Sequence, residues 1–222
     1  MTTGFHPPVE EYLEAMYELE EAGVAVIRAR LAERLGHAAP TVSEMVRRLE
    51  SDGYVQAKGR NLKMTSSGRH VAESVVRKHR LAERLLADVI GLEWHKVHAE
   101  AGRWEHVISD DVEQRLIILL ENPSTCPHGN PIPGTTPPKR KLRSLGDADA
   151  GQRVRLERIT ETVELDRDSL EYLDTSGFRP GTEATVQAKA PDGTLTLSVD
   201  GATVAIGPSL AAELYVADAG HR

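Results

Sequence analysis

Apolar side chains recur at every third or fourth position through the first fifty residues, which is the spacing of amphipathic helices. Residues 8–22 predict one such helix. Two shorter helices are predicted at 28–36, where Gly36 ends the pattern, and at 38–53, where Gly53 ends it. The N-terminal part of the chain is therefore expected to be helical.

A hairpin follows these helices. Residues 54–68 predict two short strands around the turn Lys58-Gly59-Arg60. With the three-residue turn 37–39, the order helix, turn, helix, hairpin is that of a winged helix-turn-helix. The same order also fits any small helical domain with an appended hairpin. The predicted core consists of Leu31, Leu35, Val42, Met45, Val46 and Leu49.

Long helical patterns fill the middle of the chain. They span 69–90, 93–107 and 109–121, and the last has Ser109 at a suitable N-cap position. These segments carry more apolar side chains than three isolated helices usually bury. We therefore expect this part of the chain to form a homodimer interface.

The pattern changes after residue 121. Proline and glycine are frequent at 122–141, which argues against regular structure there, and 141–150 is expected to be a linker. Alternating apolar positions then predict short strands around a helix at 166–177, hence a small β-barrel. The expected fold class is mainly α with small β. Its parts are a winged helix-turn-helix at 1–72, a helical dimerisation domain at 73–140, the linker at 141–150 and a barrel domain at 151–222.

Composition narrows the class of protein. The N-terminus "MTTGFHPPVEEYLEAM" has no basic and apolar signal-peptide regions, and no apolar run is long enough to cross a bilayer. Cys126 is the one cysteine among 222 residues, so no internal disulfide can form. We expect a soluble cytoplasmic protein with no membrane partner.

Charge is distributed unevenly. The whole chain has a formal net charge of −7, yet residues 24–72 hold nine basic and four acidic side chains, a net charge of +5. A basic segment in an acidic chain is typical of a surface that contacts phosphates. This charge favours the DNA-binding interpretation of the predicted winged helix.

Closely spaced carboxylates and imidazoles occur on three predicted helices, and these are ligand types for a divalent transition ion. At 100° per residue, a helix over 93–107 would place four positions on one stripe. Charged pairs at this spacing are also common on solvated helix faces, so the spacing alone leaves both interpretations open. No motif for catalysis accompanies them. The three sets are Glu11 and Glu14; His79 and Glu83; and His98, Gly102, Glu105 and His106.

Several segments resemble one known family. "RARLAERLGHAAPTVSEMVRRLESDGYV", "KVHAEAGRWEHVISDDVEQRL" and "GNPIPG" are similar to the diphtheria toxin repressor family of metal-activated repressors, which has iron-responsive and manganese-responsive members. The resemblance covers residues 8–135 densely, and the barrel matches only in type. It implies a homodimer that binds double-stranded operator DNA, an SH3-like C-terminal domain and two metal sites per subunit.

The resemblance also implies ligands at both sites. The ancillary site takes its first three ligands from the helical domain and the rest from the SH3-like domain. The primary site combines the first helix with the helical domain. The ancillary candidates are His79, Glu83 and His98 with one or more of Glu164, Asp166 and Asp168, and the primary candidates are Glu11, Glu14, Glu105 and His106.

Two positions depart from the iron-responsive pattern, which has methionine in place of Glu11 and cysteine in place of Gly102. The remaining oxygen and imidazole donors suit Mn²⁺ better than Fe²⁺. Because Gly102 offers no side chain, either water completes the shell, Glu14 substitutes for it, or the primary site is weakened; the first two are favoured.

The second helix of the winged motif is the expected recognition helix. Thr41 and Ser43 can meet phosphates or base edges, and Pro40 can touch thymine methyl groups. Glu44 either accepts from a cytosine N4 or points away from DNA. The full set of DNA-contact candidates is Arg28, Ala39, Pro40, Thr41, Ser43, Glu44, Arg47, Arg48, Lys58 and Arg60.

The sequence thus predicts a metal-activated transcriptional repressor that controls metal-homeostasis genes, with Mn²⁺ favoured and Fe²⁺ as the alternative. It predicts no enzyme activity and no small-molecule substrate. Two rival hypotheses are a metal-independent winged-helix regulator and a metalloenzyme that uses Glu105 and His106 at an open site. The basic wing counts against the enzyme, and the three-helix ligand set counts against the metal-independent regulator.

Overall fold

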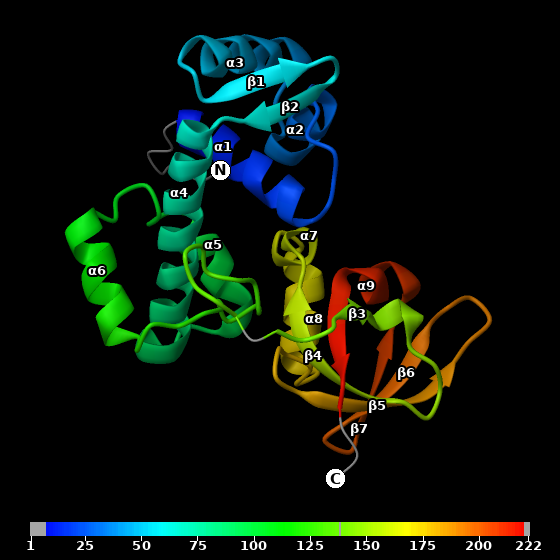
Figure 1. Ribbon diagram of the computed structural model, residues 1–222. Helices are drawn as coiled ribbons and strands as arrows, with labels where there is room; N and C mark the ends of the chain where they lie inside the picture. The colour runs from blue at the N-terminus through cyan, green and yellow to red at the C-terminus, as the bar shows by residue number, and fades with distance from the viewer. Residues whose placement is uncertain (1–7, 138, 220–222) are drawn as a thin grey trace.

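The computed structural model describes residues 8–137 and 139–219, arranged as an N-terminal winged helix, a helical column and a C-terminal β domain (Figure 1). The winged helix-turn-helix prediction is confirmed. Its two strands pair antiparallel as the wing. The elements are α1 (Pro8–Glu21), α2 (Arg28–Leu35), α3 (Ala39–Ser51), β1 (Val55–Lys58) and β2 (Asn61–Met64).

The core of the winged helix contains the predicted residues. Four of them are fully buried, and Leu35 and Met45 pack against these at partial exposure. Gly36 ends α2 with a positive φ of 65°, a conformation that glycine adopts without strain, and its N–H bonds to Ala32. The turn therefore lies at 36–38, one residue earlier than expected. The four buried residues are Leu31, Val42, Val46 and Leu49.

The helical domain differs from the prediction in one important element. The single helix expected over 93–107 is wrong: a short 3₁₀ turn leads into a five-residue helix, and residues 102–107 form turns. A helical wheel over this range therefore does not describe the side-chain directions. The elements are α4 (Ser66–Arg84), the π-helix η1 (Leu85–Ile90), η2 (Trp94–Lys96), α5 (Val97–Ala101) and α6 (Asp110–Leu119).

Side-chain caps begin the two longer helices of this domain. The Thr65 hydroxyl accepts a hydrogen bond from the Gly68 N–H at the start of α4, and the Ser109 hydroxyl accepts from the Val112 N–H at the start of α6. The cap expected at Ser109 is thereby confirmed. Gly68 lies so close to Tyr54 that an added Cβ would be 2.1 Å from its carbonyl oxygen. This close contact holds the winged helix against the first turn of α4.

The C-terminal domain is a six-stranded antiparallel sheet in the order β3-β8-β4-β5-β6-β7. The expected linker is shorter in the structure, because Arg143–Ser144 pairs with the last strand and 145–147 forms a 3₁₀ turn. That last strand was not predicted. The elements are β3 (Arg143–Ser144), η3 (Leu145–Asp147), β4 (Arg153–Ile159), α7 (Glu161–Glu164), α8 (Arg167–Thr175), β5 (Glu183–Lys189), β6 (Leu195–Val199), β7 (Ala202–Ile206), α9 (Pro208–Glu213) and β8 (Leu214–Asp218).

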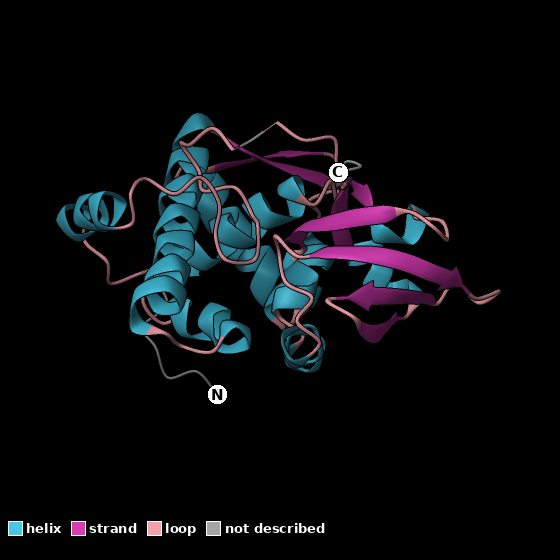
Figure 2. Ribbon diagram, turned by 90° about the horizontal axis from the view of Figure 1, so that it is seen from below, coloured by secondary structure: helices cyan, strands magenta, loops and turns pink. Residues whose placement is uncertain are grey.

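The sheet lies beside the helical domain (Figure 2). Trp94 of η2 belongs to the buried core of the C-terminal domain, and its indole N–H donates to the Pro127 carbonyl. His95 Nδ1 lies 2.6 Å from an Asp174 oxygen of α8. The proline-rich loop, residues 122–137, lies in the same seam between the helical and C-terminal domains. There the Ile159 N–H donates to the His128 carbonyl at 3.0 Å. Two domains that are distant in sequence are thus packed around one loop.

None of the helices in the described parts of the chain is both long and apolar enough to cross a membrane.

Candidate metal centre

Metal-ligand side chains gather where α1, α4, α5, the proline-rich loop and α7 meet. Within each group, the candidate ligand atoms lie within 4.8 Å of one another. We divide them into three centres. Centre I is Glu14, Glu105 and His106; centre II is His79, Glu83 and His98 with Glu161 and Glu164; centre III is Glu83, Cys126, His128 and Glu164.

Centre I joins α1 to the turn after α5. His106 Nε2 lies 3.1 Å from Glu105, and Nδ1 lies 2.7 Å from Glu10 of α1. The His106 side chain is only 1% exposed. Glu10 was not predicted, although it is one helical turn from Glu14. Glu11 instead lines the adjoining pocket of about 210 Å³, together with Glu14.

Negative charge dominates centre I. Burial raises the pKa of Glu14, and the nearby Glu105 and Glu18 carboxylates raise it further. Burial acts in the same direction on Glu105, but the neighbouring His79 and His106 hold its pKa at about 2. Glu105 also contacts His79 Nδ1 directly. Buried carboxylates that repel one another favour a bound cation.

Centre II connects the helical domain to the C-terminal domain through His98. Its Nδ1 lies 3.3 Å from Glu83 and 3.2 Å from Glu164, and its Nε2 lies 3.2 Å from Glu161. His79 Nε2 lies 3.3 Å from the same Glu83 oxygen. His79 and Glu83 are four positions apart on α4, and Glu161 and Glu164 are three apart on α7. Because side chains at these spacings lie on one face of a helix, both members of each pair point toward the same centre.

Two predicted ligands do not reach this centre. Asp166 and Asp168 are exposed at the start of α8 and lie in none of the groups formed by the described residues. Asp166 instead accepts a hydrogen bond from Ser169 at 2.6 Å. Glu164 does lie in the centre, and Glu161, which was not predicted, lies there with it. The helix α7 ends at Glu164, whereas Asp166 and Asp168 belong to the exposed start of the next helix, α8.

Burial alone would lower the pKa of His98, but Glu161 and hydrogen bonds to Glu164 and Glu83 raise it to about 10. Burial and the Glu18 charge raise the pKa of Glu161 to about 7. The metal-free centre is therefore held together by shared protons, which a cation would replace.

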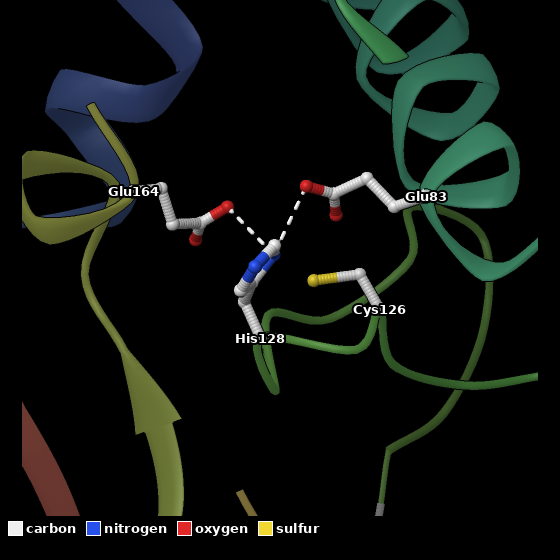
Figure 3. A group of neighbouring side chains, drawn as sticks. All are labelled: Glu83, Cys126, His128 and Glu164. Carbon is white, nitrogen blue, oxygen red and sulfur yellow. Dashed lines mark hydrogen bonds and ion pairs between the residues drawn. The ribbon is translucent and has the colours of Figure 1, made fainter. Parts of the chain in front are cut away.

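Centre III includes two residues that the sequence reasoning missed (Figure 3). Cys126 and His128 extend from the proline-rich loop between Glu83 of α4 and Glu164 of α7. His128 Nδ1 lies 3.0 Å from Glu83 and 3.2 Å from Glu164. The Cys-x-His spacing is a sequence signal for a metal site, although it stands in a segment rich in proline and glycine. Cys126 therefore supplies a sulfur donor at centre III, outside the primary site where sulfur ligands are replaced by Glu11 and Gly102.

The residues of centre III fit a metal ion. Among the described side chains, Glu83 Oε2 and His128 Nε2 are buried atoms without a hydrogen-bond partner. Such atoms are uncommon in folded proteins unless an ion or ligand satisfies them. Burial raises the pKa of the Cys126 thiol to about 12, so the thiolate would form only with a cation beside it.

The DNA-contact candidates lie on the surface of the winged helix. Thr41, Lys58 and Arg60 are exposed. The Ser43 hydroxyl donates to the Ala39 carbonyl at 2.9 Å, and Arg28 lies 3.7 Å from Glu50. The exposed members also include Ala39, Pro40, Glu44, Arg47 and Arg48, so the start of α3 and the tip of the wing are both accessible.

A winged helix joined to buried groups of imidazole, carboxylate and thiol ligands defines a class: metal-responsive DNA-binding regulators. The comparisons with known proteins agree. The model for the iron dependent repressor N-terminal DNA binding domain matches residues 5–61, and that for its metal binding and dimerisation domain matches 65–134. The FeoA domain model matches 143–218. The chain belongs to the diphtheria toxin repressor family of metal-dependent transcriptional repressors, whose members are repressors rather than enzymes.

Individual relatives cover nearly the whole chain. The iron-dependent repressor of Mycobacterium leprae is 47% identical over 204 residues, which are 86% of this chain and 88% of the relative. The diphtheria toxin repressor of Corynebacterium diphtheriae is 44% identical over 217 residues, 91% and 93% of the two chains. A structure of a manganese-dependent transcriptional repressor in complex with manganese has a TM-score of 0.84 at 32% identity, covering 95% of this chain and 100% of that one.

Proposed function

We propose that this chain is a homodimeric repressor whose binding to operator DNA is activated by a divalent transition ion, with Mn²⁺ favoured over Fe²⁺. One observation carries the proposal: carboxylates and imidazoles from α1, the helical domain and α7 converge on adjoining buried centres. A bound cation neutralises the carboxylates there. The regulated genes are those of metal-ion homeostasis, and the protein acts in the cytoplasm, where such DNA lies.

The residues of α1 connect the metal to DNA binding. Glu14 is on the helix that packs under the winged motif, whereas Glu105 and His106 belong to the helical domain. Glu11 lines the pocket beside them. Holding these groups together fixes the recognition helix relative to the helical domain, and the fixed arrangement binds DNA more tightly by linkage.

The donor atoms support Mn²⁺ at centre I, which has only oxygen and nitrogen ligands among its described residues. The Cys126 thiol gives centre III a softer donor, which suits Fe²⁺ as well. The relatives at 47% identity are named iron-dependent, and the structural neighbour at 32% identity is named manganese-dependent. An iron-dependent repressor is accordingly the second candidate.

The dimer interface is proposed for the helical domain. Several large apolar side chains of this domain are exposed in the single chain, and burying them requires a partner. They are Val89, Ile90, Val107, Val112, Ile118 and Leu119.

The test is a DNA titration. Duplexes are first selected from a random library in the presence of Mn²⁺, and binding is then measured by fluorescence anisotropy with Mn²⁺, with Fe²⁺ under anaerobic conditions and with chelator. We expect tight binding only with metal. Equal affinity with chelator would instead favour a metal-independent regulator, and a stronger response to Fe²⁺ would favour the iron-dependent repressor.

A further inference from the structure

Arg34 occupies the junction of the winged helix and the C-terminal domain. It lies near the end of α2, and its guanidinium pairs with Glu18 of α1 and, at 3.1 Å, with Glu161 of α7. The three side chains are only 16%, 12% and 16% exposed. An ion pair this sheltered from water is screened less than one on the surface.

Glu161 belongs to two interactions at once. The oxygen that contacts Arg34 also lies 3.2 Å from His98 Nε2 in the helical domain. One carboxylate thereby joins α2, α5 and α7, which come from three different domains. Figure 1 shows α7 directly below the winged helix, with the rest of the C-terminal domain farther away.

The charge around Arg34 explains why this contact matters. The pocket of about 210 Å³ beside it is lined by Glu11, Glu14, Glu18 and Glu161. Burial lowers the pKa of Arg34, but Glu18 and Glu161 raise it by more, so the guanidinium stays charged. Arg34 is thus a fixed cation at the edge of an acidic pocket, and without it the carboxylates of α1 and α7 would repel one another.

Arg34 is also close to the recognition helix. The turn at 36–38 follows it directly, and α2 packs against α3 through the fully buried Leu31 and Val42. Because this core is close-packed, a displacement of α2 carries α3 with it.

We propose that Arg34 is a positioning residue, whose ion pair with Glu161 holds the winged helix against the C-terminal domain and so orients the recognition helix. The Glu161 carboxylate, which connects the C-terminal domain to centre II through His98, then also sets the position of the DNA-binding surface. This inference deepens the proposed function and rests on it for its effect on DNA.

The first experiment needs neither metal nor DNA. Small-angle scattering of the full chain, in line with size-exclusion chromatography, compares wild type with Arg34→Gln at the same oligomeric state. We expect a larger radius of gyration for Arg34→Gln, because the winged helix separates from the C-terminal domain. Arg30→Gln is the matched control, since Arg30 is on the same helix, is 54% exposed and pairs with Glu33.

Two further variants, a second substitution of Arg34 and a substitution of its partner Glu18, serve as controls for the scattering experiment. Arg34→Met keeps the packing of the side-chain stem and should expand the molecule as Arg34→Gln does, in case the glutamine variant does not fold. Glu18→Gln removes the partner within the same domain and should leave the radius of gyration unchanged. An unchanged radius in both Arg34 variants overturns the inference.

The second experiment measures DNA binding and metal binding together. Arg34→Gln should lower the metal-activated increase in DNA affinity at least about fivefold, within the usual range of coupling between sites. Calorimetric Mn²⁺ stoichiometry should stay at the wild-type value, and Arg30→Gln should stay within about twofold of wild type. A loss of folding stability alone would lower binding with and without metal equally.

The salt dependence of DNA binding separates positioning from direct contact. A lost phosphate contact would reduce the slope of log affinity against log salt by about one. Because Arg34 is enclosed by two carboxylates, we expect no change in slope, and a reduced slope would contradict the inference. If the wild-type protein binds DNA equally well with and without metal, the proposed function is wrong. The radius of gyration of the Arg34 variants would then still decide whether Arg34 holds the winged helix against the C-terminal domain.

Discussion

Several candidate ligands in centre II are surrounded by groups that stabilise their charged form. In centre II, Glu164 lies beside His98 and His128, and although burial raises the pKa of Glu164, the nearby His128 brings it to about 2. The imidazoles are correspondingly held protonated. At the scale of single residues, the metal-free protein is therefore a set of proton-linked pairs that an ion must break.

Metal binding should release protons. His98 must lose its proton to become a ligand, and its pKa in the metal-free chain is about 10. The apparent Mn²⁺ affinity should therefore rise with pH up to that value, by about tenfold per unit for each proton released. Calorimetry in two buffers of different ionisation enthalpy measures the release. Identical heats in both buffers would contradict it.

The same shift has a defined sign for stability. A histidine whose pKa is raised above 6.5 stabilises the folded metal-free chain fully below about pH 6.5, and this contribution is lost as the pH rises toward about 10. Added metal should reverse the trend, since it binds the deprotonated ligands of the folded chain.

His106→Ala should remove the ion from centre I. The imidazole is nearly fully enclosed, so no other side chain can take its place without a rearrangement. We expect the Mn²⁺ stoichiometry measured by calorimetry to fall by one site and metal-activated DNA binding to disappear. His37→Ala, at an exposed histidine outside the three centres, is the control for the metal stoichiometry. Wild-type stoichiometry in His106→Ala would exclude this ligand assignment.

Cys126→Ser should change which metals bind at centre III. The substitution keeps the side chain's size but replaces the soft sulfur by a hard oxygen, so affinity for Co²⁺ or Zn²⁺ should fall more than affinity for Mn²⁺. Because the chain has one cysteine, a thiolate-to-cobalt absorption band in the wild type can come only from Cys126. Absence of that band in the Co²⁺-loaded wild type would show that Cys126 is not a ligand.

At the scale of elements, the ends of helices decide where ligands point. The helix that carries His98 ends at Ala101, and its C-cap Gly102 leads into the turns that carry Glu105 and His106. Gly102 has a φ of −60° and an added Cβ would meet nothing closer than 3.8 Å. It lines the pocket at centre I without filling it.

Two glycine substitutions test this interpretation of the elements. Gly68→Ala should destabilise the fold by roughly 1–3 kcal/mol, because its Cβ would clash with the Tyr54 backbone where α4 crosses the winged helix. Gly102→Ala should be neutral or slightly stabilising. Chemical denaturation of both variants measures the difference. Equal stabilities would refute the packing argument.

At the scale of the whole molecule, an exposed apolar surface should hold the dimer together. Ile90 is 55% exposed and lines a pocket of about 710 Å³ with Leu86, Leu92 and Trp104. Ile90→Glu should therefore shift the protein to monomers in analytical ultracentrifugation and weaken DNA binding, because a dimer engages two half-sites. Val24→Glu, an exposed apolar position in the winged helix, should stay dimeric. A dimeric Ile90→Glu variant would place the interface elsewhere.

The sequence by itself determined the local elements and the ligands with helical spacing. Turn residues and apolar periodicity placed α2, α3 and the wing, because these signals act within a few residues. The sequence predicts the pair His79 and Glu83 from their positions four apart, and Glu161 and Glu164, three apart, have the same kind of spacing. The family resemblance then connected distant segments that no periodicity joins.

Only the tertiary structure decided which distant groups meet. The end of α5 at Ala101 replaced a predicted straight helix by turns, because caps and packing override weak helical preference. The folding of the proline-rich loop into the domain seam brought Cys126 and His128 to Glu83. The packing of the winged helix against the C-terminal domain placed Glu161 against Arg34, a contact between residues 127 positions apart in sequence. Long-range packing of this kind leaves no pattern in the local sequence, since its energy comes from surfaces that exist only after the domains have folded.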